Sequence, residues 1–158
     1  LVDTQVDPAM LELEITESVA MHGWGQVQER LQGLKKQGVS VAIDDFGTGF
    51  SSLSYLARLP VDTLKIDRSF VIDMTAGPQG LALVSTIIKL AHSLKLKVVA
   101  KGVETEEQRR LLHLLDCDEM QGFLFSKPLP VEMFEARFLA PPGPGDGSRP
   151  ELDKEPGP

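Results

Sequence analysis

The sequence has very little cysteine and no long apolar run. Cys117 is the only cysteine, so no intrachain disulfide can form, which is typical of a reducing compartment. No apolar run approaches the roughly 18 residues that span a membrane. Residues 1–10, LVDTQVDPAM, have neither the basic region nor the apolar core of a secretory signal. We therefore expect a cytoplasmic protein without a membrane segment in this chain.

Basic residues are also fewer than acidic ones. The chain has 16 Lys and Arg against 23 Asp and Glu, which gives a formal net charge of -7. Nucleic-acid polymers are bound largely through basic side chains on phosphates, so we do not expect this chain to bind them. A small nucleotide is compatible with an acidic chain, because metal ions can invert the local charge of a site.

The two ends of the chain differ in composition. Residues 141–158 are rich in proline and glycine and nearly devoid of apolar side chains, which predicts a disordered tail. The chain begins without methionine and enters a strand-like segment almost at once. We interpret residues 1–140 as part of one domain of a longer protein.

Apolar periodicity predicts five strands that alternate with helices. The strands are expected at residues 11–16, 39–44, 63–67, 97–100 and 122–126. The longer helices are expected at about 25–37, from Pro78 onward, after a Thr105–Gln108 capping box, and at about 131–139. This order predicts an α/β fold with a parallel sheet and right-handed crossovers. It leaves open whether the sheet closes into a barrel or is doubly wound.

Charged and polar residues gather near the carboxyl ends of the expected strands. They are Glu14, Glu17, Asp44, Asp45, Lys65, Asp67, Lys101, Glu104 and Gln121. Parallel strands present their carboxyl ends on one face of the fold, where binding sites form. Strand alternation also turns Glu14, Asp44 and Lys65 away from their apolar neighbours. We therefore expect these side chains to converge.

Clustered carboxylates suit divalent metals. They repel each other and resist ionisation unless a positive charge compensates, and hard oxygen ligands prefer Mg²⁺, Mn²⁺ or Ca²⁺. Two such ions about 3.5–4 Å apart can activate water in phosphodiester cleavage. Lys65 would hold a phosphate or the attacking water. Taken singly, each residue has a plainer interpretation as a cap, a loop anchor or a salt-bridge partner, so the prediction depends on their joint occurrence.

Five stretches resemble successive motifs of the EAL family of cyclic-di-GMP phosphodiesterases. They are LEITES, AIDDFGTGFSSL, LKIDRSF, VVAKGVET and QGFLFSKP, in the family's order and spacing. The resemblance implies a (β/α)8 TIM-barrel-like fold, present here as its C-terminal portion, an incomplete barrel of about five parallel strands. It also implies hydrolysis of cyclic-di-GMP to linear pGpG with Mg²⁺ or Mn²⁺.

The resemblance implies a role for each residue near a strand end. The metal ligands would be Glu14, Asp44 and Asp45. The catalytic positions would be Lys65, Lys101 and Asp45. The substrate side would hold Glu104, Asp67 and Gln121. Glu17 resembles the glutamate that anchors the loop Asp45–Ser52, which in the family couples dimerisation to activity. The resemblance therefore also implies a homodimer through this loop and upstream regulatory domains in a longer protein.

The sequence departs from the family pattern at three ligand positions. The Glu-Ala-Leu strand and the asparagine ligand of the following strand are absent, and the family's AEGVE reads AKGVE, with Lys101 in place of a glutamate. An ammonium donates hydrogen bonds but accepts none. It would repel metals or shed its proton, replace a metal's charge by pairing with Asp44 or Asp45, or turn outward to solvent.

These departures predict a phosphodiesterase that is weakened or inactive. The alternative is a degenerate EAL module that binds cyclic-di-GMP or a protein partner without cleaving it. A third hypothesis is an incomplete barrel that lacks an independent function or is completed by association, because five strands leave an exposed sheet edge.

Overall fold

The computed structural model describes residues 4–21, 24–49 and 53–139. The elements in chain order are η1 (Pro8–Met10), β1 (Glu12–Thr16), α1 (Glu17–Met21), α2 (Trp24–Lys36), β2 (Ser40–Phe46), α3 (Leu53–Leu56), β3 (Thr63–Ile66), α4 (Arg68–Asp73), α5 (Pro78–Ser93), β4 (Lys97–Lys101), α6 (Glu106–Leu114), β5 (Glu119–Gln121), α7 (Val131–Phe134) and η2 (Glu135–Leu139). The chain divides into two compact units, residues 1–127 and 128–158.

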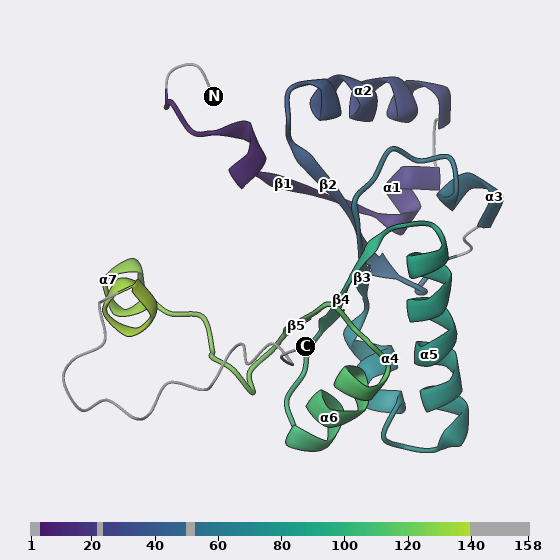
Figure 1. The fold of residues 1–158 in the computed structure, drawn as a ribbon, viewed down its shortest axis with the longest axis vertical. Coiled ribbons are helices and arrows are strands. Elements are labelled where there is room, and N and C mark those ends of the chain that lie inside the picture. Colours follow the sequence, from purple (N-terminus) through teal and green to yellow (C-terminus); the bar gives the residue numbers. More distant parts are fainter. Residues whose placement is uncertain (1–3, 22–23, 50–52, 140–158) are drawn as a thin grey trace, which may run out of the picture. The chain divides into compact units, whose positions relative to one another are not determined.

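The first unit is built on one parallel sheet. Its strands pair in the order β1-β2-β3-β4-β5, each with the next strand along the chain. The sheet curves, and helices α2, α5 and α6 lie on its convex side (Figure 1). A doubly wound sheet would reverse its strand order at a switch point. The sequential order is instead that of an α/β barrel, which confirms the α/β fold and resolves the alternative left open by the sequence.

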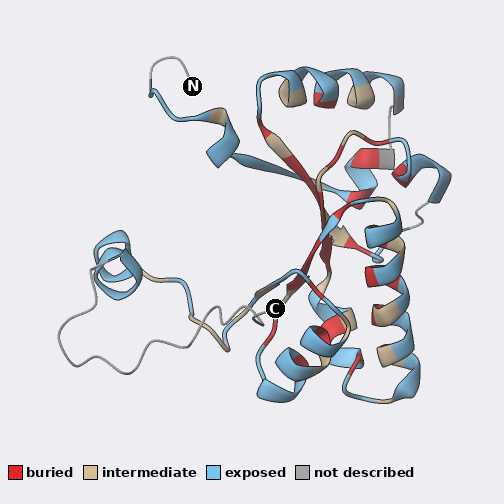
Figure 2. Ribbon diagram, in the orientation of Figure 1, coloured by how far each residue is buried: buried red, intermediate tan, exposed pale blue. Residues whose placement is uncertain are grey.

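The core of this unit follows from strand alternation. Ile43, Leu64, Ile66 and Val98 are almost completely buried, and Figure 2 shows buried residues along the middle of the sheet. These side chains belong to one hydrophobic cluster with Val84, Ile88 and Ala91 of α5. Because successive strand residues point to opposite faces, the intervening polar residues occupy the other, concave face.

Local sequence signals explain where several helices begin. Pro78 is the first residue of α5, where its missing N–H costs nothing. Thr105 and Gln108 form the expected capping box at the start of α6. The short helix α4, which the periodicity did not predict, begins after Asp67, whose side chain accepts a hydrogen bond from the Ser69 N–H.

The strand expected at residues 122–126 is wrong. The fifth strand is Glu119–Gln121, and the chain turns out of the sheet at Gly122. A Cβ on Gly122 would lie 2.1 Å from the carbonyl oxygen of Val103, so only glycine permits this close passage. The composition of GFLFS favours a strand, but these residues form a turn instead, in which the Phe125 N–H donates to the Gly122 carbonyl at 3.2 Å.

The described part of the second unit is helical from Val131 to Leu139. Helix α7 continues directly into η2, and the rings of Phe134 and Phe138 lie with their centroids 5.0 Å apart. This confirms a helical segment at residues 131–139. The tail expected at residues 141–158 and the end of the Asp45–Ser52 loop lie outside the described residues. Within the described ranges, no helix is both long enough and apolar enough to cross a membrane.

Glu17 holds the start of the loop that follows β2. Its side chain is 2% exposed, and Oε2 accepts hydrogen bonds from the backbone N–H of Gly47 at 2.7 Å and of Gly49 at 3.4 Å. Gly47 has a φ of 100°, a conformation that only glycine adopts without strain. Glu17 therefore lies against the described part of the loop and accepts hydrogen bonds from its backbone.

A substitution at Leu64 can test the hydrophobic core on the convex side of the sheet. Leu64 lies in the central strand and is 0% exposed. We expect Leu64→Ala to lower the free energy of unfolding by about 3–5 kcal/mol, because it removes buried apolar contacts and leaves a cavity. Leu114→Ala, at a residue that is 75% exposed on α6, should change it by less than about 0.5 kcal/mol. Urea unfolding followed by circular dichroism measures both, and equal effects would contradict the assigned core.

Glu17 can be tested through the loop that it binds. Glu17→Ala should remove the acceptor of the Gly47 and Gly49 amides, so these amides should exchange hydrogen faster. The unfolding free energy should fall by about 1–3 kcal/mol, the cost of unsatisfied buried groups. Glu29→Ala, on the exposed side of α2, is the matched control. Unchanged exchange at both glycines in Glu17→Ala would exclude the anchoring role.

Candidate functional site

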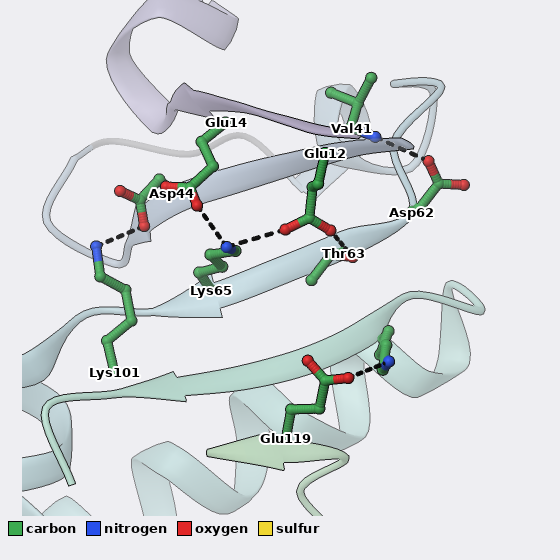
Figure 3. Close-up of polar contacts among 10 residues, drawn as sticks. Glu12, Glu14, Val41, Asp44, Asp62, Thr63, Lys65, Lys101 and Glu119 are labelled. Atoms are coloured by element: carbon green, nitrogen blue, oxygen red, sulfur yellow. Dashed lines mark hydrogen bonds and ion pairs between the residues drawn. The ribbon is translucent and has the colours of Figure 1, made fainter. Parts of the chain in front are cut away.

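The concave face of the sheet carries a row of charged side chains. Alternation along β1 puts Glu12 and Glu14 on this face, and β3 and β4 contribute Lys65 and Lys101. Figure 3 shows these four side chains and Asp44 on the same side of the strands. The structure therefore brings together the predicted set Glu14, Asp44, Asp45, Lys65 and Lys101, and adds Glu12 to it.

Asp44 and Asp45 reach the same cation although they are consecutive in β2. In a regular strand, neighbouring residues point to opposite faces. Here the β2–β3 register shifts between Ile43 and Phe46, and Asp45 has a φ of 52°. This is a bulge-like irregularity, which redirects side chains, and aspartate tolerates the left-handed conformation better than most residues. This local distortion lets both aspartates reach Lys101.

Lys101 lies between these two carboxylates. Its Nζ donates to Oδ1 of Asp44 at 2.6 Å and to Oδ1 of Asp45 at 2.9 Å, and its side chain is 27% exposed. Desolvation by burial acts to lower the pKa of Lys101, but the hydrogen bonds and charges of the two aspartates outweigh it and raise that pKa. Of the three placements considered for Lys101, the structure shows the pairing with the aspartates.

Lys65 is held in the same manner by two glutamates. Its Nζ lies 2.6 Å from Oε1 of Glu14 and 2.9 Å from Oε1 of Glu12, and the residue is 8% exposed. Burial acts to lower its pKa, but the bonds to Glu14 and Glu12 outweigh this and raise it. Glu12 also accepts from the Thr63 hydroxyl at 2.9 Å. The sequence signal for Glu12 was its place two residues before Glu14 on one strand face.

The residues predicted for the substrate side lie outside these charge pairs. Asp67 caps α4, and its pKa is lowered because hydrogen bonds from Ser69 outweigh desolvation. Glu104 pairs with Arg68, whose Nη2 lies 2.8 Å from Oε1 of Glu104. Gln121 ends β5 opposite Lys101 in the strand register. Sequence analysis missed Arg68, whose signal was its place directly after the strand-end Asp67.

The described residues do not fit a divalent metal. Mg²⁺ or Mn²⁺ would need several oxygen ligands around one point. Within residues 4–21, 24–49 and 53–139, no group of three His, Cys, Asp or Glu side chains could hold such an ion. Glu14 is paired with Lys65, and both aspartates are paired with Lys101. The expected ligands are thus divided between two ammonium groups.

Comparisons with other sequences agree on one family. The profile of the EAL domain matches residues 1–128. The chain is 50% identical over 125 residues to the cyclic di-GMP phosphodiesterase NbdA of Pseudomonas aeruginosa, covering 79% of this chain and 16% of that protein. It is 44% identical over 138 residues to the signaling protein YkoW of Bacillus subtilis, covering 87% of this chain and 17% of that protein. The chain therefore spans a minor part of the curated relatives it matches.

Solved structures show the same similarity in three dimensions. The PaMucR phosphodiesterase in its c-di-GMP complex superposes with a TM-score of 0.82 at 46% identity, over 85% of this chain and 54% of that chain. BlrP1 of Klebsiella pneumoniae, in a manganese and cy-diGMP complex, gives 0.75 at 35% identity, over 81% of this chain and 33% of that chain. Sequence motifs, sequential parallel strands and these matches lead to one conclusion: the chain belongs to the EAL domain family.

Proposed function

We propose that this chain binds cyclic-di-GMP at the carboxyl end of its sheet and that its hydrolysis of this ligand to linear pGpG is strongly weakened. Family membership and the complexes of PaMucR and BlrP1 with the dinucleotide support the ligand. The observation that carries the weakened hydrolysis is the position of Lys101, with Nζ 2.6 Å from Asp44 and 2.9 Å from Asp45.

The strand-end residues offer suitable chemistry for a cyclic dinucleotide. The ligand has two anionic phosphodiesters and two guanine bases. The Arg68 side chain is 56% exposed, and a guanidinium binds phosphate oxygens or stacks on bases. Guanine presents N–H groups that can donate hydrogen bonds to carboxylates such as Asp67 and Glu104. Binding therefore does not require the two paired lysines to leave their carboxylates.

Cleavage makes different demands from binding. Hydrolysis of a phosphodiester needs a group that accepts a proton from the attacking water and a positive charge at the leaving oxygen. Lys101 is an ammonium with a raised pKa, so it has no lone pair to accept a proton at neutral pH. Lys65 is already shared by Glu12 and Glu14. All three positions expected to be catalytic, Lys65, Lys101 and Asp45, are therefore engaged in internal ion pairs.

A second candidate function is a binding module without any turnover. The same Lys101 contacts favour it, and only the residual rate separates it from a weakened enzyme. A homodimer through the Asp45–Ser52 loop, upstream regulatory domains and a cytoplasmic location stay predictions.

Binding and turnover can be measured on the same preparation. Calorimetry should show that the chain binds cyclic-di-GMP, whereas chromatography with Mg²⁺ or Mn²⁺ should show pGpG formation at least ~100-fold slower than by NbdA assayed in parallel. This factor is the lower end of what a positioned general base contributes. An absence of binding would contradict the proposed ligand, and turnover comparable to that of NbdA would contradict the weakened hydrolysis.

Arg68 provides a test of where the ligand binds. Arg68→Ala should weaken cyclic-di-GMP binding by about 10- to 100-fold, the usual effect of losing a charged hydrogen bond. Arg110→Ala, at an exposed arginine on α6, removes the same charge away from the strand ends and should leave the dissociation constant unchanged. Equal affinities of the two variants in calorimetry would exclude binding at the Arg68 side of the sheet.

A further inference from the structure

We propose that the Lys101 ammonium is the resident cation of this site and takes the place of a divalent metal between β2 and β4. The inference deepens the proposed function and depends on it only for the location of the site. It assigns to one side chain the charge that an EAL site would otherwise draw from solution, and it predicts that the site does not bind Mg²⁺ or Mn²⁺.

The contacts of Lys101 are those of a bridging cation. Its Nζ lies within 2.9 Å of one oxygen from each aspartate, and an ammonium has three donors to offer. A metal ion on the same two oxygen atoms would lie about 2.0–2.2 Å from each. It would then stand within a few ångströms of Nζ, where two positive charges repel strongly. Ammonium and metal therefore exclude each other at this position.

The length of the lysine side chain explains how Lys101 alone can do what a glutamate and a metal ion would do together. Strands β2 and β4 are not neighbours, because β3 lies between them. Two strand spacings separate them, roughly 9–10 Å. The Lys101 side chain crosses this gap and meets Asp44 and Asp45 directly. A glutamate at position 101 is one bond shorter and negatively charged, so it would need a cation to connect it to the aspartates.

The surroundings of Lys101 hold it at this place. Ala100, which precedes it, and Val103, two residues further on, are completely buried, and its strand is paired on both sides, with β3 and with β5. The Asp44 side chain is 15% exposed. The Lys101 side chain therefore crosses the carboxyl end of β3, and because its cation belongs to the chain, a chelator cannot remove it.

Metal binding without the dinucleotide tests the inference. Calorimetric titration with MnCl2 should show no specific binding to the unaltered chain, and EDTA should leave its melting temperature unchanged. Lys101→Glu places a third carboxylate beside Asp44 and Asp45. It should bind Mn²⁺ at least 10-fold more tightly than the unaltered chain, and its melting temperature should rise with Mn²⁺ concentration because the ion binds only the folded state.

Two further variants separate this effect from a change of net charge or of folding. Lys89→Glu, at an exposed lysine of α5, makes the same charge change and should gain no Mn²⁺ binding. Lys101→Gln removes the ammonium without adding a carboxylate, so it should gain Mn²⁺ binding that is weaker than that of a folded Lys101→Glu. If Lys101→Glu folds poorly, Lys101→Gln carries the test. Specific Mn²⁺ binding by the unaltered chain that is lost in Asp44→Asn would overturn the inference, and so would the absence of any gain in both Lys101 variants. Neither result bears on cyclic-di-GMP binding, which is measured separately.

Discussion

The arrangement of the concave face depends on two lysines, Lys65 and Lys101, each of which is paired with two carboxylates. Four acidic side chains, Glu12, Glu14, Asp44 and Asp45, lie on one side of a five-stranded sheet with Lys65 and Lys101 between them. Partly enclosed charges are costly unless they are paired with good geometry. Removing either lysine would leave two like charges facing each other. The negative charge of this face is therefore compensated by side chains of the protein itself.

The architecture followed closely from the sequence. The two-residue period of the strands predicted which side chains face the helices, and Ile43, Leu64 and Ile66 are buried there. Glycine, proline and a capping box marked the starts or ends of the longer helices. One exception is the fifth strand, which ends at Gln121, just before Gly122, where the backbone passes too close to Val103 for any residue but glycine. Such a contact between distant segments leaves little trace in local composition.

The sequence predicted which side chains gather at the strand ends, but not which of them pair with one another. The motifs named Glu14, Asp44, Asp45, Lys65 and Lys101, and the parallel sheet explains why they meet. They did not show that Asp44 and Asp45 act together, because a regular strand would separate them and only the irregularity at Asp45 redirects the side chain. Nor did they choose among the three placements of Lys101. That choice depends on a distance across β3, which the sequence does not contain.

The reach of Lys101 across β3 also has a genetic consequence. Codons for lysine and glutamate differ only in their first base, so the ammonium form of this site and a carboxylate form are neighbours in the gene. A single base change would therefore exchange a side chain that carries its own cation for one that has to recruit an ion. Dependence on the cell's supply of divalent ions would then be a heritable trait set at one position of the sheet.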